Sequence, residues 1–378
     1  MTQPIYLDYN GTTPLAPEVV KVMRLYLESE FGNPSSAHWY GIRPRQAVAE
    51  ARRQMADLIG CDADEIIFTS GGTESNNHVI KSIAGALRDR GNHIITSQVE
   101  HPAILEVCRF MEDRGFSVTR LPVDETGRVD PNDAAAAVRS ETILISIMHA
   151  NNEVGTIQPV REIAAIAASA GILMHTDAAQ SLGKIPVSVD DLGVDLLSIA
   201  GHKLYAPKGI GALYIRKTVR PQPFCHGAGQ EHGVRAGTEN VPGIAGLGKA
   251  CELIAAGLKK KASHMKSMRD RLEAALGSEV PDIRFNGHPD LRLPNTSSVS
   301  FAGLEADRLL EEIGLTVAAS AGAACHSGQV TVSHVLSAMK LPDSWARGTL
   351  RFSTGSPTTA AEIDRAAEVI IAAVNQLR

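Results

Sequence analysis

The sequence lacks the features that mark disulfide-stabilised, secreted and membrane-spanning proteins. It has five cysteines, an odd number, and no two of them are spaced as Cys-x-x-Cys, so we expect neither a disulfide framework nor a structural zinc site. The segment "MTQPIYLDYNGTTPLAPE" has neither a basic nor an apolar stretch, so we expect no secretory signal. No apolar run reaches about 18 residues, and we therefore expect no membrane span.

Strong charge is also absent. The net charge is −5 and is spread along the chain, without a basic run that would suit nucleic acid or an acidic tail. Together with the cysteine usage, these absences favour a cytoplasmic protein that binds neither nucleic acid nor a membrane. With 378 residues and 44% apolar content, the chain is long enough for two or three domains and a large core.

The sequence does contain a regular alternation of short apolar runs with helical patterns. The runs "EIIFT", "HIITS", "TILIS" and "ILMHTD" have the length and composition of buried strands, and amphipathic segments separate them. This order predicts βαβ units, and therefore an α/β fold with a mostly parallel central sheet and helices on both faces. After about residue 260 the pattern changes to a smaller α+β domain that starts with a long amphipathic segment.

Polar clusters follow the strand-like runs. They are "SGGTES", "VEH", "HANNE", "HTDAAQ" and "GHK". Because ligands of such sheets bind at the carboxyl ends of the strands, these clusters predict a binding site at that edge.

The glycine-rich turn "SGGTES", residues 70–75, connects a predicted strand to a predicted helix. Backbone N–H groups at a helix N-terminus bind anions such as phosphate, and the Thr73 hydroxyl can add a contact. The alternative interpretation is an ordinary helix start, with Thr73 or Ser70 as its cap.

Asp177 and Lys203 each end a predicted strand, and His101 ends the "VEH" cluster. A lysine and a buried aspartate beside a phosphate cup indicate pyridoxal phosphate, which the lysine holds as a Schiff base while the aspartate pairs with the pyridinium nitrogen. His101 would stack on the ring or move protons. Taken singly, Asp177 can be a helix cap, Lys203 a solvated side chain and His101 a core histidine, but together at one sheet edge they favour the cofactor site.

These motifs, with several others in the same order, resemble the cysteine desulfurases, a pyridoxal phosphate-dependent group within the class V aminotransferases. The resemblance covers nearly the whole chain, and the selenocysteine lyases share most of the motifs. The motifs are "LDYNGTTP", "FGNPSS", "FTSGGTESNN", "VEH", "HANNEVGTIQP", "HTDAAQ", "GHKLYAPKGIGALYIR", "GQEHGVRAGTENVPGI", "SAGAACHS" and "LRFSTG".

The resemblance implies a role for each cofactor residue. It implies that Lys203 is the Schiff-base lysine, Asp177 the pyridinium partner, Gln180 the ligand of the ring oxygen and His101 the stacking histidine. Further cofactor contacts are implied for Gly72, Thr73, His202 and Asn152. The implied fold is that of the type I pyridoxal phosphate enzymes, with a large cofactor-binding domain at residues 15–260 and a small domain at residues 1–14 and 261–378. No metal is implied.

Substrate and subunit contacts are implied as well. Thr238 matches a residue that reaches the phosphate of the neighbouring subunit, which implies a homodimer. Asn33 and Arg351 match residues that hold the substrate carboxylate, a group that an arginine binds with two parallel hydrogen bonds. Two positions depart from the family pattern: Ala200 replaces a phosphate-binding serine, and Ser356 stands where many relatives have arginine.

The implied reaction removes sulfur from L-cysteine, gives L-alanine and leaves a persulfide on Cys325, from which an acceptor protein takes the sulfur for iron–sulfur clusters or other thio-cofactors. Only a thiolate is nucleophilic, and an unperturbed cysteine titrates at about 8.5, so His326 or His101 is a candidate to assist Cys325. The small residues of "SAGAACHSGQV" predict a loop that can swing. The alternatives are a selenocysteine lyase, a true aminotransferase and a non-catalytic cofactor-binding scaffold.

Overall fold

A seven-stranded sheet forms the centre of the larger of two lobes in the computed structural model, which describes residues 4–326 and 329–378, with the backbone alone at 323–331. In spatial order its strands are β2 (Ile66–Thr69), β8 (Gly211–Ile215), β7 (Leu196–Ala200), β6 (Leu173–Asp177), β5 (Thr142–Ser146), β3 (His93–Ser97) and β4 (Ser117–Leu121). Strand β8 runs antiparallel to both of its neighbours, and the other pairs are parallel. The predicted mostly parallel sheet is therefore confirmed.

Helices cover both faces of this sheet, because successive side chains of a strand point to opposite sides. On β2, Ile66 packs into one hydrophobic core and its neighbour Ile67 into another. The first core contains residues of α2 (Trp39–Ile59), α6 (Val160–Ser169) and α8 (Val241–Ala255). The second contains residues of α3 (Gly72–Ala86) and α4 (Pro102–Glu112).

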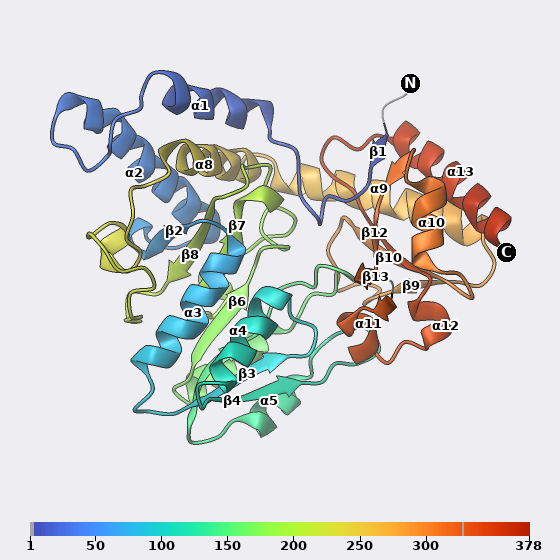
Figure 1. Cartoon of the computed structure of the whole chain (residues 1–378), viewed down its shortest axis with the longest axis horizontal. Coiled ribbons are helices and arrows are strands. Elements are labelled where there is room, and N and C mark those ends of the chain that lie inside the picture. The colour runs from blue at the N-terminus through green and yellow to red at the C-terminus, as the bar shows by residue number, and fades with distance from the viewer. Residues whose placement is uncertain (1–3, 327–328) are drawn as a thin grey trace.

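Shorter elements complete the larger lobe. They are α1 (Pro17–Glu28), α5 (Pro131–Ala137), α7 (Val189–Leu192) and the 3₁₀ turns η1 (Ala63–Glu65), η2 (Gly201–Lys203) and η3 (Glu231–Gly233). Helix α1 packs on α8, beside α2 (Figure 1).

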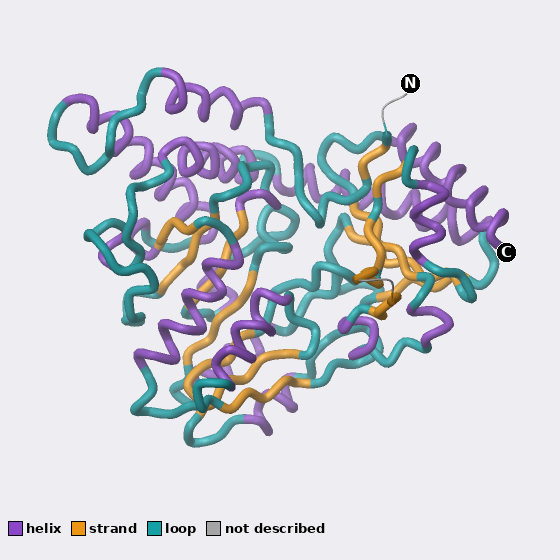
Figure 2. The backbone as a smooth tube through the Cα atoms, viewed as in Figure 1, coloured by secondary structure: helices purple, strands orange, loops and turns teal. Residues whose placement is uncertain are grey.

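The smaller lobe is built on an antiparallel four-stranded sheet with a core of its own (Figure 2). Its strands, in spatial order, are β12 (Ser320–Ala321), β15 (Thr349–Ser353), β10 (Thr296–Phe301) and β9 (Ile283–Asn286). Helices α9 (Leu258–Glu279), α10 (Ala306–Ile313) and α13 (Ala360–Leu377) pack against it. Strand β1 (Ile5–Tyr6) pairs in parallel with β11 (Val317–Ala318), so the start of the chain joins this lobe.

Helix α9 extends from the larger lobe into the smaller one (Figure 1). Within the described ranges, no single helix is long and apolar enough to cross a membrane. Helices α8 and α9 pass that test of length and composition only as a pair, and the pair is bent by 79°.

The segment from residue 333 to 346 packs on the larger lobe, although it lies within residues 261–378, which the predicted division assigns to the small domain; that division stays a prediction. Helices α11 (His334–Ala338) and α12 (Asp343–Ala346) contribute Val335, Leu336 and Ala346 to the core of the larger lobe. A hydrogen bond also joins this segment to the larger lobe: Nε2 of His334 donates to the main-chain oxygen of Glu100 at 2.9 Å.

The sequence predicted a loop around Cys325, and the backbone on both sides of residues 327–328 instead forms two short strands. Residues Ala323–His326 (β13) and Gln329–Val332 (β14) form an antiparallel hairpin in which Cys325 lies opposite Val330. The side chains of Cys325 and His326 lie outside the described residues.

Burial in the smaller core allows a matched test. Leu309 is fully buried on α10, whereas Leu315 is 92% exposed just after that helix. We expect Leu309→Ala to lower the free energy of unfolding by about 2–5 kcal/mol, because it removes buried methyl groups and leaves a cavity. Leu315→Ala should change it by less than about 0.5 kcal/mol. Chemical denaturation of both variants measures the difference, and equal losses would contradict this packing.

Candidate functional site

A cavity of about 400 Å³ lies at the carboxyl ends of β6 and β7, beside the N-terminus of α3. Its volume is within the range of small-molecule sites, about 300–1,000 Å³. Nine of the residues assigned from the sequence line it: Gly72, Thr73, His101, Asn152, Asp177, Gln180, His202, Lys203 and Arg351. The fold therefore brings residues from distant parts of the chain together at the carboxyl ends of the strands, the place that the polar clusters predicted.

The N-terminus of α3 forms one wall. Gly71 is its N-cap with a φ of 147°, and no side chain caps the first turn, so neither Thr73 nor Ser70 has the capping role considered as the alternative. The first-turn N–H groups are left for a ligand, which suits an anion. An added Cβ on Gly72 would lie 3.3 Å from the Cβ of Ala200, so the two residues are in close contact.

His202 lies on the same side of the cavity. Burial, followed by the charge of Lys203, lowers the pKa of His202 to about 4. Its Nδ1 lies 3.1 Å from Oγ1 of Thr12. His202 is therefore a neutral hydrogen-bonding group at neutral pH, rather than a cation.

Asp177 lies at the end of β6, with 6% of its surface exposed. One carboxylate oxygen accepts a hydrogen bond from the main-chain N–H of Ala179 at 2.9 Å, and the other accepts from Nδ2 of Asn76 at 2.7 Å. The amide of Asn76 thus fixes the carboxylate in the cavity wall. Oδ1 of Asn76 is buried and has no hydrogen-bond partner in the described part of the chain.

His101 is the N-cap of α4. Its Nδ1 accepts a hydrogen bond from the main-chain N–H of Ala103 at 3.1 Å, so in the neutral ring the proton is on Nε2. Burial lowers the pKa of His101, and the nearby Asp177 opposes that effect. The ring therefore keeps one N–H donor.

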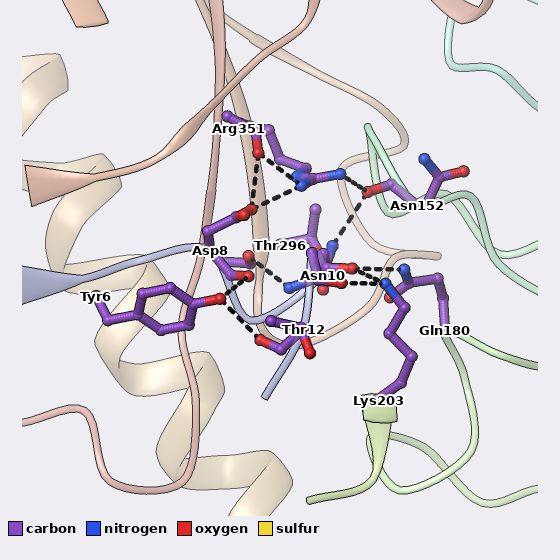
Figure 3. Close-up of polar contacts among 12 residues, drawn as sticks. Tyr6, Asp8, Asn10, Thr12, Asn152, Gln180, Lys203, Thr296 and Arg351 are labelled. Atoms are coloured by element: carbon purple, nitrogen blue, oxygen red, sulfur yellow. Dashed lines mark hydrogen bonds and ion pairs between the residues drawn. The ribbon is translucent and has the colours of Figure 1, made fainter. Parts of the chain in front are cut away.

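Lys203 lies in the turn η2, directly after β7. Its Nζ donates to the main-chain oxygen of Asn10 and, at 2.6 Å, to that of Gly11 (Figure 3). Burial and then the charge of Arg351 lower the pKa of Lys203 to about 8, while Asp8 and Asp177 act against them. Lys203 is thus no solvated surface lysine, and a useful fraction of its amine is neutral near physiological pH.

Arg351 on β15 closes the cavity from the smaller lobe. Its guanidinium donates to Oδ1 of Asp8 at 2.7 Å, to Oγ of Ser320 at 3.0 Å and to the main-chain oxygen of Asn152 at 3.0 Å (Figure 3). Nε of Arg351 is buried and has no partner among the described residues. The side chain is therefore rigidly held and still has a donor for a carboxylate.

Three assigned residues are not placed in the cavity by this chain alone. Asn33 is exposed between α1 and α2, where its Oδ1 accepts from the N–H of Ser35 at 2.9 Å. Thr238 is exposed between η3 and α8. The Cys325 side chain lies outside the described residues. Their roles stay predictions.

Several important residues received no role from the sequence. Asn10 and Gly11 line the cavity, Asp8 bonds Arg351, and Asn76 bonds Asp177. The motifs "LDYNGTTP" and "TESNN" contain all four, but polar residues in short motifs do not reveal which partners they contact. The structure also shows the two residues that depart from the family pattern. Ala200 lines the cavity, and the N–H of Ser356 donates to the Tyr205 hydroxyl at 2.7 Å.

The fold and the lysine–aspartate site define a class of protein. The family model for aminotransferase class-V matches residues 5–366. The chain therefore belongs to the class-V aminotransferase family.

Within that family the chain belongs with the cysteine desulfurases. It is 50% identical to the cysteine desulfurase IscS of Dictyoglomus turgidum, over 100% of this chain and 96% of that protein. It is 48% identical to the cysteine desulfurase IscS of Methanosarcina thermophila, over 99% of this chain and 93% of that protein. A solved NifS-like protein superimposes with a TM-score of 0.94 at 37% identity, over 99% of this chain and 100% of the other. A solved structure of SspA in complex with cysteine superimposes with a TM-score of 0.83 at 37% identity, over 94% of this chain and 99% of the other.

The lowered pKa of Lys203 leads to a direct test. Only an uncharged amine attacks an acylating reagent, so acetylation of Lys203 in the ligand-free protein should reach half its maximal rate near pH 8. An unperturbed lysine would do so near about 10.4. Peptide mass spectrometry after brief acetylation across the pH range measures this, with the exposed Lys208 as internal reference. A midpoint near that unperturbed value for Lys203 would contradict the effect of burial.

Proposed function

We propose that this protein is a pyridoxal phosphate-dependent cysteine desulfurase, which converts L-cysteine to L-alanine and carries the sulfur as a persulfide on Cys325. The observation that carries the proposal is the convergence of Lys203, Asp177, His101 and Arg351 on one cavity. The names of its relatives, and the complex of one solved neighbour with cysteine, support the substrate.

The residues that line the cavity fit the cofactor. The first turn of α3, with Thr73 and His202, suits a phosphate, because it has N–H groups that no side chain caps. Asp177, held by two donors, keeps lone pairs for a protonated ring nitrogen. Gln180 would bond the ring oxygen, and Lys203 would bind the aldehyde carbon through Nζ. His101 and Asn152 complete the wall around the ring.

When bound, the cofactor supplies an electron sink that stabilises negative charge at Cα of an amino acid. The chain supplies the proton transfers. Nζ of Lys203, with its pKa near 8, is suited to accept the Cα proton once the substrate amine has replaced it. His101 has an N–H donor at Nε2 for a second transfer at the same cavity.

Substrate orientation and sulfur transfer would use the other wall. Arg351, fixed by Asp8 and by Asn152, would bind the substrate carboxylate and so orient the amino acid. The Cys325 thiolate would then attack the substrate sulfur. An S–S bond forms as the C–S bond breaks, and the electron pair of the broken bond, with a proton, completes L-alanine.

The partners are part of the proposal. Phe31, Trp39 and Tyr40 form an exposed aromatic cluster next to Asn33, with Phe31 72% and Trp39 68% exposed. Such an exposed aromatic cluster is typical of a protein interface. It supports a homodimer in which Asn33 lies near the contact surface between the two subunits. A sulfur-acceptor protein in iron–sulfur or other thio-cofactor synthesis, and a cytoplasmic location, also remain proposals.

Catalysis can be tested with two substitutions. We expect the wild type with pyridoxal phosphate to release alanine and sulfide from L-cysteine in the presence of a thiol reductant. Lys203→Ala should lose the absorbance band of the lysine-bound cofactor and at least about 10³-fold in turnover, because it removes both the anchor and the base. Cys325→Ala should keep the band and lose L-cysteine turnover to a similar extent. The controls are Lys208→Ala and Cys61→Ala.

The outcomes separate the alternatives. Full activity of Cys325→Ala on L-cysteine would exclude the persulfide route. A preference for L-selenocysteine that survives Cys325→Ala would favour a selenocysteine lyase, and amino transfer dependent on 2-oxo acids would favour an aminotransferase. A wild type without the absorbance band would exclude the cofactor.

The alanine at position 200 gives a third prediction. Ala200→Ser places a hydroxyl beside Gly72 at the phosphate side, and one added hydrogen bond should lower the cofactor dissociation constant about three- to tenfold. Ala200→Cys has nearly the same size but only a weak donor, so it should leave the constant almost unchanged. Equilibrium dialysis of the three proteins measures it. Equal tightening by both variants would show that filled volume, not hydrogen bonding, is responsible.

A further inference from the structure

Lys184 is a buried lysine with no role in the proposed reaction. It lies in the turn that follows β6, with 4% of its surface exposed, and it is not among the residues that line the cavity. Its Nζ donates to Oε1 of Gln180 at 2.6 Å and to Oδ1 of Asn10 at 2.9 Å. Both acceptors belong to residues that do line the cavity. Lys184 is thus directly behind the wall of the site.

Burying the amine of Lys184 costs folding free energy. Burial lowers its pKa well below that of an ordinary lysine, and the charges of Lys203 and Arg351 lower it further. Among the described residues, no ion pair is recorded between Lys184 and a carboxylate. A buried amine without a counter-ion contributes little to stability. Its contacts with Gln180 and Asn10 therefore point to a role at the site.

The geometry determines how the Gln180 side chain is turned. The main-chain oxygen of Asn10 can only accept a hydrogen bond, so the Gln180 amide atom that faces it is the nitrogen, and the atom that faces the donors of Lys184 is the oxygen. The NH₂ end of Gln180 is then directed to the other side, where it donates to the main-chain oxygen of Asn10 at 3.0 Å. An NH₂ group has two hydrogens, and the second has no recorded acceptor within the described ranges, so it remains for a group in the cavity.

Asn10 is turned in the same way. Its Oδ1 accepts from Lys184 and, at 3.0 Å, from Nδ2 of Asn295. Its main-chain oxygen accepts from Lys203 and from Gln180 (Figure 3). The single amine of Lys184 therefore bonds two residues of the cavity wall, and one of them, Asn10, also bonds Lys203.

We propose that Lys184 is a positioning residue that holds the Gln180 amide with its NH₂ group toward the cavity, so that the site presents a donor to an anionic oxygen of the bound cofactor. This inference rests on the proposed function. Without Lys184, only the bond to the main-chain oxygen of Asn10 still holds the Gln180 amide among the described residues, so its orientation is less strongly fixed.

A double-mutant cycle in the cofactor-loaded enzyme tests this inference. Lys184→Met keeps the apolar stem and removes the donors, and Gln180→Leu removes the amide. We expect Lys184→Met to raise the cofactor dissociation constant about tenfold and to shift the absorbance maximum of the lysine-bound cofactor. In the Gln180→Leu background, the same substitution should change the dissociation constant by less than about twofold and should not shift the absorbance maximum. Lys184→Gln keeps a donor and should recover most of the affinity.

Lys261 provides the matched control. It is a half-buried lysine whose pKa is lowered by burial and whose Nζ donates to the main-chain oxygen of Leu253 at 3.0 Å. Lys261→Met should therefore leave the absorbance maximum and the dissociation constant unchanged. If Lys184→Met fails to fold, Lys184→Leu, which also removes the donors, takes its place in the cycle with the same expectation.

Two outcomes overturn the inference. One is a Lys184→Met enzyme with wild-type cofactor affinity and spectrum. The other is an equal loss in both backgrounds, which would show that Lys184 does not act through Gln180. A wild type that binds no cofactor would instead refute the proposed function, so the two failures are distinguishable.

Discussion

The hydrogen bonds of Asn10 join the start of the chain to both lobes at the cavity. Its amide donates to Oγ1 of Thr296 in the smaller lobe and to the main-chain oxygen of Asn152 in the larger one. Its main-chain oxygen accepts from Lys203, and its side-chain oxygen accepts from Lys184. Asn10 is 1% exposed, so each of these groups depends on a protein partner instead of water. The geometry of the cavity follows from this network.

The electrostatics of the cavity follow from the same close packing. The charges of Lys203 and Arg351 lower the pKa of Lys184, and the charge of Arg351 lowers the pKa of Lys203, where Asp8 and Asp177 compensate only in part. Cations in this arrangement favour bound anions, because a phosphate and a carboxylate would relieve the repulsion. A ligand with both groups would therefore also stabilise the folded protein.

The sequence predicted most of what depends on local pattern. The alternation of apolar runs with helices indicated the parallel sheet, and the polar clusters at strand ends contain eight of the nine assigned residues that line the cavity. The ninth, Arg351, was assigned from the family resemblance. It did not reveal Asn76, Asp8 or Lys184, because their roles depend on partners up to several hundred positions away in the chain. The hairpin at Cys325 was also missed, since the small residues before Cys325 indicate a loop, and the β-branched run of β14 that favours a strand is short. Packing of α11 with the larger lobe was missed for a related reason: a few apolar residues do not show which of two cores they join.

The hairpin of β13 and β14 has a consequence for how far its cysteine can travel. On one side of the hairpin, the Ser320 hydroxyl donates to Asp8, and on the other, the Ser333 hydroxyl donates to Glu153. Cys325 is five positions from Ser320, and five fully extended residues span only about 17 Å. A group confined to such a radius has an effective concentration on the order of 10–100 millimolar at its target, and the two tethers limit how far it can leave. An acceptor protein would therefore have to approach the cavity entrance, since the tether restricts how far the persulfide can be carried toward it.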